Sequence, residues 1–275
     1  MDAIFTKERR YYLMGISIFL ITMFHWSGNA SDNLLHKLIV LLFSNGNIGN
    51  NAFFLLSSYG LCFSYNNNSL GHFYKNRIFR IYPLVLVFFV IALLLDKPSL
   101  REFLVELPMQ ISSLSLCTDY CKAWFIQGLT ILYIFFPVIY KIVLFIYHKG
   151  ILFLFVLIFF CLLSSIYVCP FYAHMFYVNF TCIVLGIVMY LCEKDSNDVF
   201  LITSVGFLAL LSFLPIAQGH GLTIPLIYFT LGSRCIMLLR KPLIFLGKHS
   251  LEIYLSQILV MPLIPVKGGG HIGLV

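Results

Sequence analysis

The stretch IYPLVLVFFVIALLL, residues 81–95, decides the fold class, because it holds no charged side chain. A helix that crosses a bilayer needs about 20 mostly apolar residues, and this stretch approaches that length on its own. The rest of the chain is similar: of 275 residues, 60% are hydrophobic and 11% are charged. A soluble domain carries roughly 25% charged residues. The composition therefore predicts an all-α polytopic integral membrane protein.

Apolar segments of spanning length recur along the chain. Counting them predicts about nine transmembrane helices, with the 81–95 segment drawing on Arg80 and its neighbours to reach full length. The candidate spans are 11–27, 47–65, 81–95, 123–146, 150–169, 175–192, 199–216, 221–239 and 249–265. Residues 1–267 are expected to form one membrane domain, and the glycine-rich 268–275 a flexible tail.

The distribution of basic residues predicts the orientation. Cytoplasmic loops of membrane proteins are enriched in lysine and arginine. With the N-terminus in the cytoplasm, most of the 18 basic residues fall in inner segments, and the outer segments hold only Lys37, Lys97, Arg101, Lys122 and Lys267. The formal charge of +7 therefore indicates topology and not nucleic-acid binding. A bacterial inner membrane, with the 96–122 loop outside, is the expected location.

Two polar pairs near the predicted spans have structural interpretations. Cys117 and Cys121 share the outer loop, where an oxidising compartment would permit a disulfide. Two cysteines alone do not make a zinc site. Glu252 lies in the last span and needs a partner there. Lys248, four residues earlier on a helix, is the expected one.

His25 stands near the end of the first apolar segment, fifteen residues after Arg10. An ionisable side chain at that depth is costly and indicates function or a specific partner. Two interpretations are open: His25 is a helix-packing group that hydrogen-bonds to a neighbouring span, or a general base that takes a proton from a hydroxyl near neutral pH.

Arg77 and Arg80 precede the 81–95 stretch, and a spacing of three residues places both on one helical face. Two planar guanidiniums suit a phosphate-rich ligand. Arginines at a cytoplasmic helix end also serve as topology signals or lipid-phosphate contacts. In the second span, Ser57 and Ser58 precede Gly60. They are either small residues for close helix packing or hydroxyls that orient reactants.

Four segments, in this order, resemble the membrane-bound acyltransferase-3 family. Residues 14–25 resemble its first-helix signature, which ends in the histidine, and 49–60 its second-helix block. Residues 74–83 resemble its Arg-x-x-Arg block followed by Ile-Tyr-Pro, and 246–257 its late Gly-Lys to Tyr-Leu block. Members of this family move acyl groups, usually acetyl, from cytoplasmic acyl-coenzyme A to sugars of surface glycans.

The resemblance implies roles for particular residues. His25 would be the general base, and Arg10, Arg77 and Arg80 would bind the donor. Ser57 and Ser58 would orient the reactants or the developing oxyanion. It also implies acyl-coenzyme A, normally acetyl-coenzyme A, as donor, and a glycan or lipid-linked sugar as acceptor. No permanently bound cofactor, metal or nucleic acid is expected.

The chain departs from the family pattern in three respects. Met14 occupies the position of an arginine eleven residues before the histidine, and Arg10, one turn earlier, is the expected substitute. Leu129 stands where many members have glutamate. The family core has ten helices against the nine counted. Two alternatives to an active enzyme follow: a truncated, inactive homologue, and a transporter or flippase for a glycan or lipid-linked precursor. Paired repeats or broken helices in two halves would favour the transporter, and the sequence shows none.

Overall fold

The computed structural model describes residues 6–27, 46, 48–95, 99–118, 121, 123–150, 171–197 and 239–260. These residues form eight α-helices and one 3-10 helix, with no strand among them. The spans expected at 150–169, 199–216 and 221–239 and the tail at 268–275 fall almost wholly outside them. The chain divides into two compact units, one of residues 57–191 and one of residues 1–56 with 192–275.

Five long helices form at or around predicted spans: α1 (Lys7–Ser27), α3 (Ile48–Asn67), α4 (Leu70–Leu95), α6 (Trp124–Lys149) and α8 (Phe171–Asp195). Among the helices of the described ranges, α4 and α6 are long and apolar enough to cross a membrane, and the bent pair α12–α13 would be a third. The count of nine spans stays a prediction.

Helix α4 begins well before the predicted span, at Leu70 and not near Arg80. Ser69 starts the helix: its carbonyl accepts from the Phe73 amide at 2.9 Å, and its hydroxyl accepts from the His72 amide at 3.4 Å. Polar residues of the 70–80 segment can therefore continue the same helix as the apolar 81–95 segment. The Arg77–Arg80 pair consequently lies on a helix, as its spacing requires.

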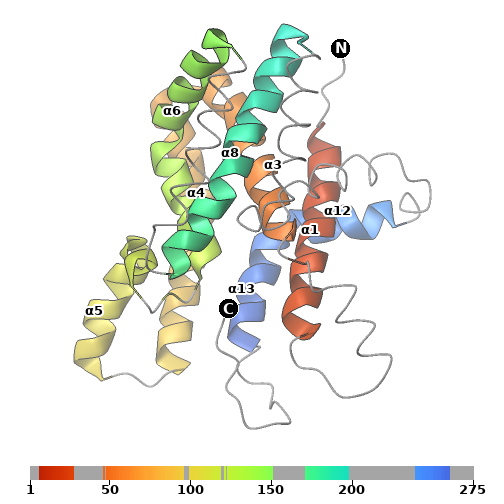
Figure 1. Cartoon of the computed structure of the whole chain (residues 1–275). Coiled ribbons are helices and arrows are strands. Elements are labelled where there is room, and N and C mark those ends of the chain that lie inside the picture. Colours follow the sequence, from red (N-terminus) through yellow and green to blue (C-terminus); the bar gives the residue numbers. More distant parts are fainter. Residues whose placement is uncertain are drawn as a thin grey trace. The chain divides into compact units, whose positions relative to one another are not determined.

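In the unit that holds the N-terminus, α1 packs against α12 (Arg240–Lys248) and α13 (Ser250–Val260). Helix α12 crosses α1, and α13 runs beside the C-terminal half of α1 (Figure 1). A 72° bend separates α12 from α13. The expected Lys248–Glu252 pair is therefore wrong: the two residues lie on different helices, both are exposed, and no ion pair joins them in this part of the structure. The ion pair that does form here joins Arg240 and Glu8 at 2.9 Å, on the exposed surface.

Two glycines allow α1 and α12 to touch through their backbones. A Cβ atom built on Gly247 would overlap the Tyr11 carbonyl oxygen and lie 2.8 Å from the Gly15 nitrogen. A Cβ on Gly15 would overlap the Leu243 carbonyl oxygen. Small residues permit this close approach, and membrane helices use it where apolar burial supplies little driving force.

We expect Gly247→Ala to destabilise the protein, because the added methyl has no space unless the two backbones separate. Overpacking of this kind costs about 1–3 kcal/mol. The loss of stability is measured as the change in melting temperature of the full chain in detergent, with size-exclusion chromatography of the fraction that stays soluble after heating. Gly71→Ala is the matched control, since nothing lies within 4 Å of a Cβ at Gly71. Equal melting temperatures for the two variants would contradict the close crossing.

In the other unit, α4 and α6 run side by side (Figure 1) and share an aromatic core. The Phe73 and Phe136 rings stack with centroids 5.9 Å apart. The Tyr74 hydroxyl donates to the Ile134 carbonyl at 2.8 Å, and the Asn66 amide, on α3, donates to the Tyr140 hydroxyl at 3.1 Å. The first two contacts join the polar half of α4 to α6, and the third joins the end of α3 to α6.

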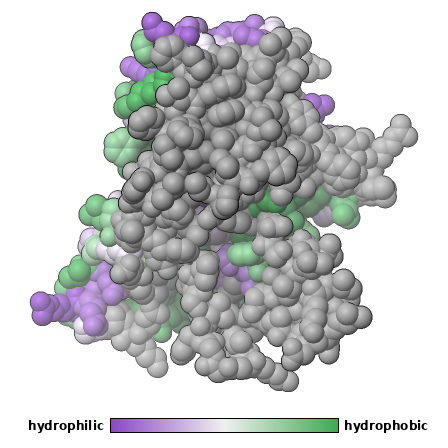
Figure 2. All heavy atoms as spheres, viewed as in Figure 1, coloured by the Kyte–Doolittle hydropathy of each residue, from purple (hydrophilic) through white to green (hydrophobic). Residues whose placement is uncertain are grey.

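The other sides of α4 and α6 expose apolar side chains. Such residues are Phe79, Leu86, Val87, Leu94, Phe135, Val138 and Phe145. In a soluble protein this exposure would be unfavourable, whereas in a bilayer lipid tails cover it. Figure 2 shows hydrophobic residues (green) on the visible outer side beside these helices. The exposed apolar surface agrees with a membrane protein.

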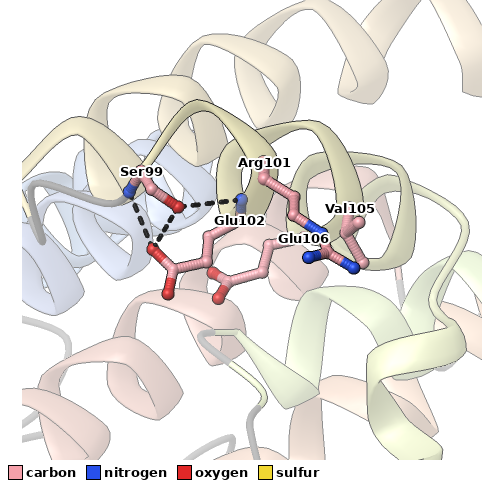
Figure 3. A pocket seen from close by; sticks show the side chains of 5 residues that line it. All are labelled: Ser99, Arg101, Glu102, Val105 and Glu106. Atoms are coloured by element: carbon pink, nitrogen blue, oxygen red, sulfur yellow. Dashed lines mark hydrogen bonds between the residues drawn. The ribbon is translucent and has the colours of Figure 1, made fainter.

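Along the chain, α4 is followed by α5 (Leu100–Ile111) and by the 3-10 helix η1 (Leu114–Cys117), and α6 comes after them. Ser99 and Glu102 form a capping box: the Ser99 hydroxyl accepts from the Glu102 amide, and the Glu102 carboxylate accepts from the Ser99 amide at 2.7 Å. The Ser99 hydroxyl also donates to the same carboxylate at 2.8 Å, and the hydrogen bonds from the Ser99 amide and hydroxyl hold the pKa of Glu102 below its ordinary value. Ser99, Arg101, Glu102, Val105 and Glu106 line a shallow surface hollow at this end of α5 (Figure 3). None of them is a predicted site residue.

Candidate active site

His25 lies in the last turn of α1 and is half-buried. Its ring contacts the Phe24 ring edge-on, with centroids 5.6 Å apart. A half-buried imidazole retains access for a ligand while being shielded from bulk solvent. This position is compatible with both interpretations of His25, as a general base and as a helix-packing group.

One turn before His25, Thr22 connects α1 to α13. The Thr22 hydroxyl donates to the Ile18 carbonyl at 2.7 Å, and the Gln257 amide nitrogen donates to the Thr22 oxygen. The Gln257 oxygen Oε1 is buried without a hydrogen-bond partner in this part of the structure. From the sequence, Gln257 was expected near Glu252 in the last span and at the end of the 246–257 block. Its pairing with Thr22 was not expected, since 235 residues separate the two.

Arg10 lies on the same helix as His25, in its first turn, and is half-buried. Fifteen residues of helix separate them by roughly 22 Å at about 1.5 Å per residue. Met14, at the position of the family arginine, is also half-buried and lies one turn after Arg10. The two positions are therefore neighbours on one face of α1.

Arg77 and Arg80 lie together on α4, three residues apart on one face. The Arg77 guanidinium lies over the Phe73 ring, 5.3 Å from its centroid, which is within the range of a cation–π contact. Both arginines lie near the phenol of Tyr133 on α6. Arg77 is half-buried and Arg80 is exposed. The pair is thus a cationic site with one anchored and one open guanidinium.

Ser57 and Ser58 lie in the middle of α3 and differ in environment. Ser58 is fully buried, and Ser57 is half-buried. Ser57 is the more accessible to a ligand. The full burial of Ser58 agrees better with helix packing than with contact to a reactant.

A buried polar cluster, missed by sequence analysis, joins α5, η1 and α6. Gln127 Nε2 donates to Gln110 Oε1 at 2.6 Å, and the Ser115 hydroxyl donates to Gln127 Oε1 at 2.6 Å. Each of the three residues is 1% exposed. Polar residues in apolar surroundings are the signal that could have found it. The cluster holds the end of α5 and η1 against the first turn of α6, where Gln127 stands two residues before the buried Leu129.

The disulfide that the sequence left possible between Cys117 and Cys121 is not formed, because both are free thiols. Cys117 is exposed and Cys121 is buried. Burial raises the pKa of the Cys121 thiol to about 11. Since the thiolate is the reactive form, Cys121 is a poor partner for oxidation near neutral pH.

The predicted residues divide between the two units. Arg10 and His25 belong to the unit with the N-terminus, and Ser57, Ser58, Arg77 and Arg80 belong to the 57–191 unit. The structure thus brings together Arg77 with Arg80 on α4, and His25 with the Thr22–Gln257 pair.

The apolar helices define an all-helical membrane protein. The sequence model of a family described as an acyltransferase domain, Acyl_transf_3, matches residues 12–268. This match covers nearly the whole chain, so the chain belongs to the acyltransferase-3 family and is a membrane acyltransferase. No curated protein and no solved structure matches the chain.

Proposed function

We propose that the protein transfers an acyl group, normally acetyl, from cytoplasmic acyl-coenzyme A to a hydroxyl of a cell-surface or exported polysaccharide sugar. The carrying observation is the family match over 12–268, together with a half-buried histidine at the end of α1. The acceptor is the glycan itself or its lipid-linked precursor.

His25 is the general base in this proposal. It removes the proton of the acceptor hydroxyl as the oxygen attacks the thioester carbonyl. A new C–O bond forms and the C–S bond breaks. His25 then returns the proton to the sulfur, so coenzyme A leaves as a thiol. Of the two serines, we assign Ser57 to donate to the developing oxyanion, because Ser58 is fully buried and less accessible to a reactant.

Arg77 and Arg80 bind the donor phosphates, with Arg10 as a further contact at the cytoplasmic face. Support comes from the geometry of α4: a guanidinium anchored on Phe73 presents its charge without the full entropic cost of ordering a free side chain. Guanidiniums bind phosphate by two parallel hydrogen bonds, which fixes the orientation of the nucleotide. No permanently bound cofactor or metal takes part.

Label transfer tests the proposal directly. We expect membranes containing the chain to move radioactive acetyl from acetyl-coenzyme A to envelope polysaccharide that mild base has freed of esters. The product label should be released again by base, because it is an ester. Membranes without the chain are the control. A chain that binds coenzyme A but transfers no label would contradict the active enzyme and favour the inactive homologue.

The proposed orientation can be tested at Cys117, which is exposed in the segment expected outside the cell. We expect a membrane-impermeant maleimide to label Cys117 in intact cells and to lose that label in Cys117→Ser. In a Cys117→Ser background, Asn67→Cys should react only after permeabilisation, since the α3–α4 turn is expected in the cytoplasm. The reverse pattern would overturn the orientation.

A further inference from the structure

The hydrogen bond between Thr22 and Gln257 determines the orientation of the Gln257 amide, that is, where its nitrogen and its oxygen lie. The hydroxyl of Thr22 has one hydrogen, and it is donated to the Ile18 carbonyl at 2.7 Å. The Thr22 oxygen must therefore accept, so Gln257 turns its NH₂ group toward α1. The carbonyl oxygen Oε1 is left as the unused end of the amide.

That oxygen is unusual in its surroundings. It is shielded from solvent and has no hydrogen-bond partner in the described part of the chain. Buried acceptors are nearly always paired, because an unpaired one loses its hydration without compensation. An orphaned acceptor that the neighbouring Thr22 holds in one orientation is suited to a donor that arrives with a ligand.

The pair lies directly beside the proposed base. Thr22 and His25 are three residues apart on α1, so they are neighbours on one helical face. Gln257 contacts that face from α13. A ligand that brings one group to His25 can bring an adjacent group to Gln257.

We propose that Gln257 binds a second hydroxyl of the sugar acceptor through Oε1, next to the hydroxyl that His25 deprotonates. The inference rests on the proposed function. A sugar ring carries neighbouring hydroxyls, and each is a hydrogen-bond donor of the kind that Oε1 lacks. At the reacting centre the acyl donor presents a thioester carbonyl and sulfur, which have no hydrogen to donate, and the nearest amide N–H of its pantetheine arm lies two carbons beyond the sulfur. We therefore assign Gln257 to acceptor recognition, and a rise in the KM for acetyl-coenzyme A alone would assign it to the pantetheine arm and overturn the proposal.

The test is the kinetics of Gln257→Met, which keeps the length of the side chain and removes the acceptor oxygen. The assay is the label transfer described above, with acetyl-coenzyme A and base-treated envelope polysaccharide each titrated. We expect the KM for polysaccharide to rise about three- to tenfold, the effect of losing one neutral hydrogen bond, while the KM for acetyl-coenzyme A stays within twofold. Ser256→Ala is the matched control, because Ser256 is the exposed neighbour on the same helix and its hydroxyl donates to the Ile253 carbonyl of that helix.

A second pair of variants keeps the test valid if Gln257→Met folds poorly. Thr22→Val removes the hydroxyl that orients the amide and should also raise the KM for polysaccharide. Thr22→Ser keeps the hydroxyl, so its KM for polysaccharide should equal that of the wild-type protein. These variants leave Gln257 in place and change only its orientation.

Three further outcomes would overturn the proposal. An unchanged polysaccharide KM in Gln257→Met, with a lower melting temperature, would make the pair a structural contact between α1 and α13. A lower kcat with unchanged polysaccharide KM would make Gln257 an orienting group for His25. Absence of transfer by the wild-type protein would contradict the proposed function, and the acceptor site would fall with it.

Discussion

Replacing His25 with glutamine should remove nearly all acyl transfer while leaving the fold intact. Glutamine retains a hydrogen-bonding side chain but cannot take the proton of a hydroxyl near neutral pH. Loss of a general base costs about a hundred- to ten-thousand-fold in rate. The measurement is labelled acetyl transfer per folded molecule, with coenzyme A binding to the purified protein as the check on integrity.

The packing alternative for His25 predicts a different pattern. An interhelical hydrogen bond in a membrane is worth about 0.6–2 kcal/mol, so its loss would lower the melting temperature and yield without changing the rate per folded molecule. His25→Ala separates the two interpretations further, since it removes both the base and the hydrogen bond. Normal transfer by a well-folded His25→Gln protein would rule out His25 as the base.

Removing Arg77 and Arg80 should weaken donor binding strongly, whereas the His25 variants should bind the donor normally. Each charge-assisted hydrogen bond to phosphate contributes about 1.5–3 kcal/mol, so each alanine variant should lose roughly ten- to a hundredfold in affinity. Calorimetric titration of coenzyme A into the purified variants measures it. Lysine should rescue only in part, because it cannot form the two parallel hydrogen bonds of a guanidinium.

Lys75→Ala is the matched control for the arginine variants. Lys75 is an exposed basic residue on the same helix, two positions before Arg77 and therefore on a different face. If local positive charge alone attracted the donor, Lys75→Ala would weaken donor binding as much as Arg77→Ala or Arg80→Ala does. Equal affinity in the wild-type protein and the Arg77→Ala/Arg80→Ala double variant would reduce both arginines to topology signals.

The helical positions could be predicted from the sequence because hydrocarbon imposes one requirement on every spanning segment. Backbone polar groups must be paired within the segment, so apolar runs of sufficient length become helices. This argument placed α1, α3 and α6 to within a few residues. It placed the start of α4 some ten residues too late, because the polar 70–80 segment has no apolar signal and is helical through Ser69 and its packing on α6.

The chemistry-bearing residues were partly predictable for a related reason. A histidine in an apolar helix and two arginines at a helical spacing are conspicuous in one dimension, and the family match confirms an acyltransferase. Their roles as base and donor-binding residues remain predictions. The Lys248–Glu252 pair was wrong because spacing along the chain does not report a 72° bend. The Cys117–Cys121 disulfide stayed open for a similar reason, since spacing does not report the burial of one thiol.

The sequence by itself determined that the chain is a helical membrane protein, where its described long helices lie, and which family it belongs to. Each of these depends on local composition or on the order of motifs. Only the tertiary structure decided that Gly15 and Gly247 bring two backbones into contact and that Gln110, Ser115 and Gln127 form one buried cluster. It alone also joined Gln257 to Thr22 beside His25. Such contacts link residues distant in the chain, and in hydrocarbon they depend on shape and on pairing of individual polar atoms, neither of which a hydropathy pattern contains.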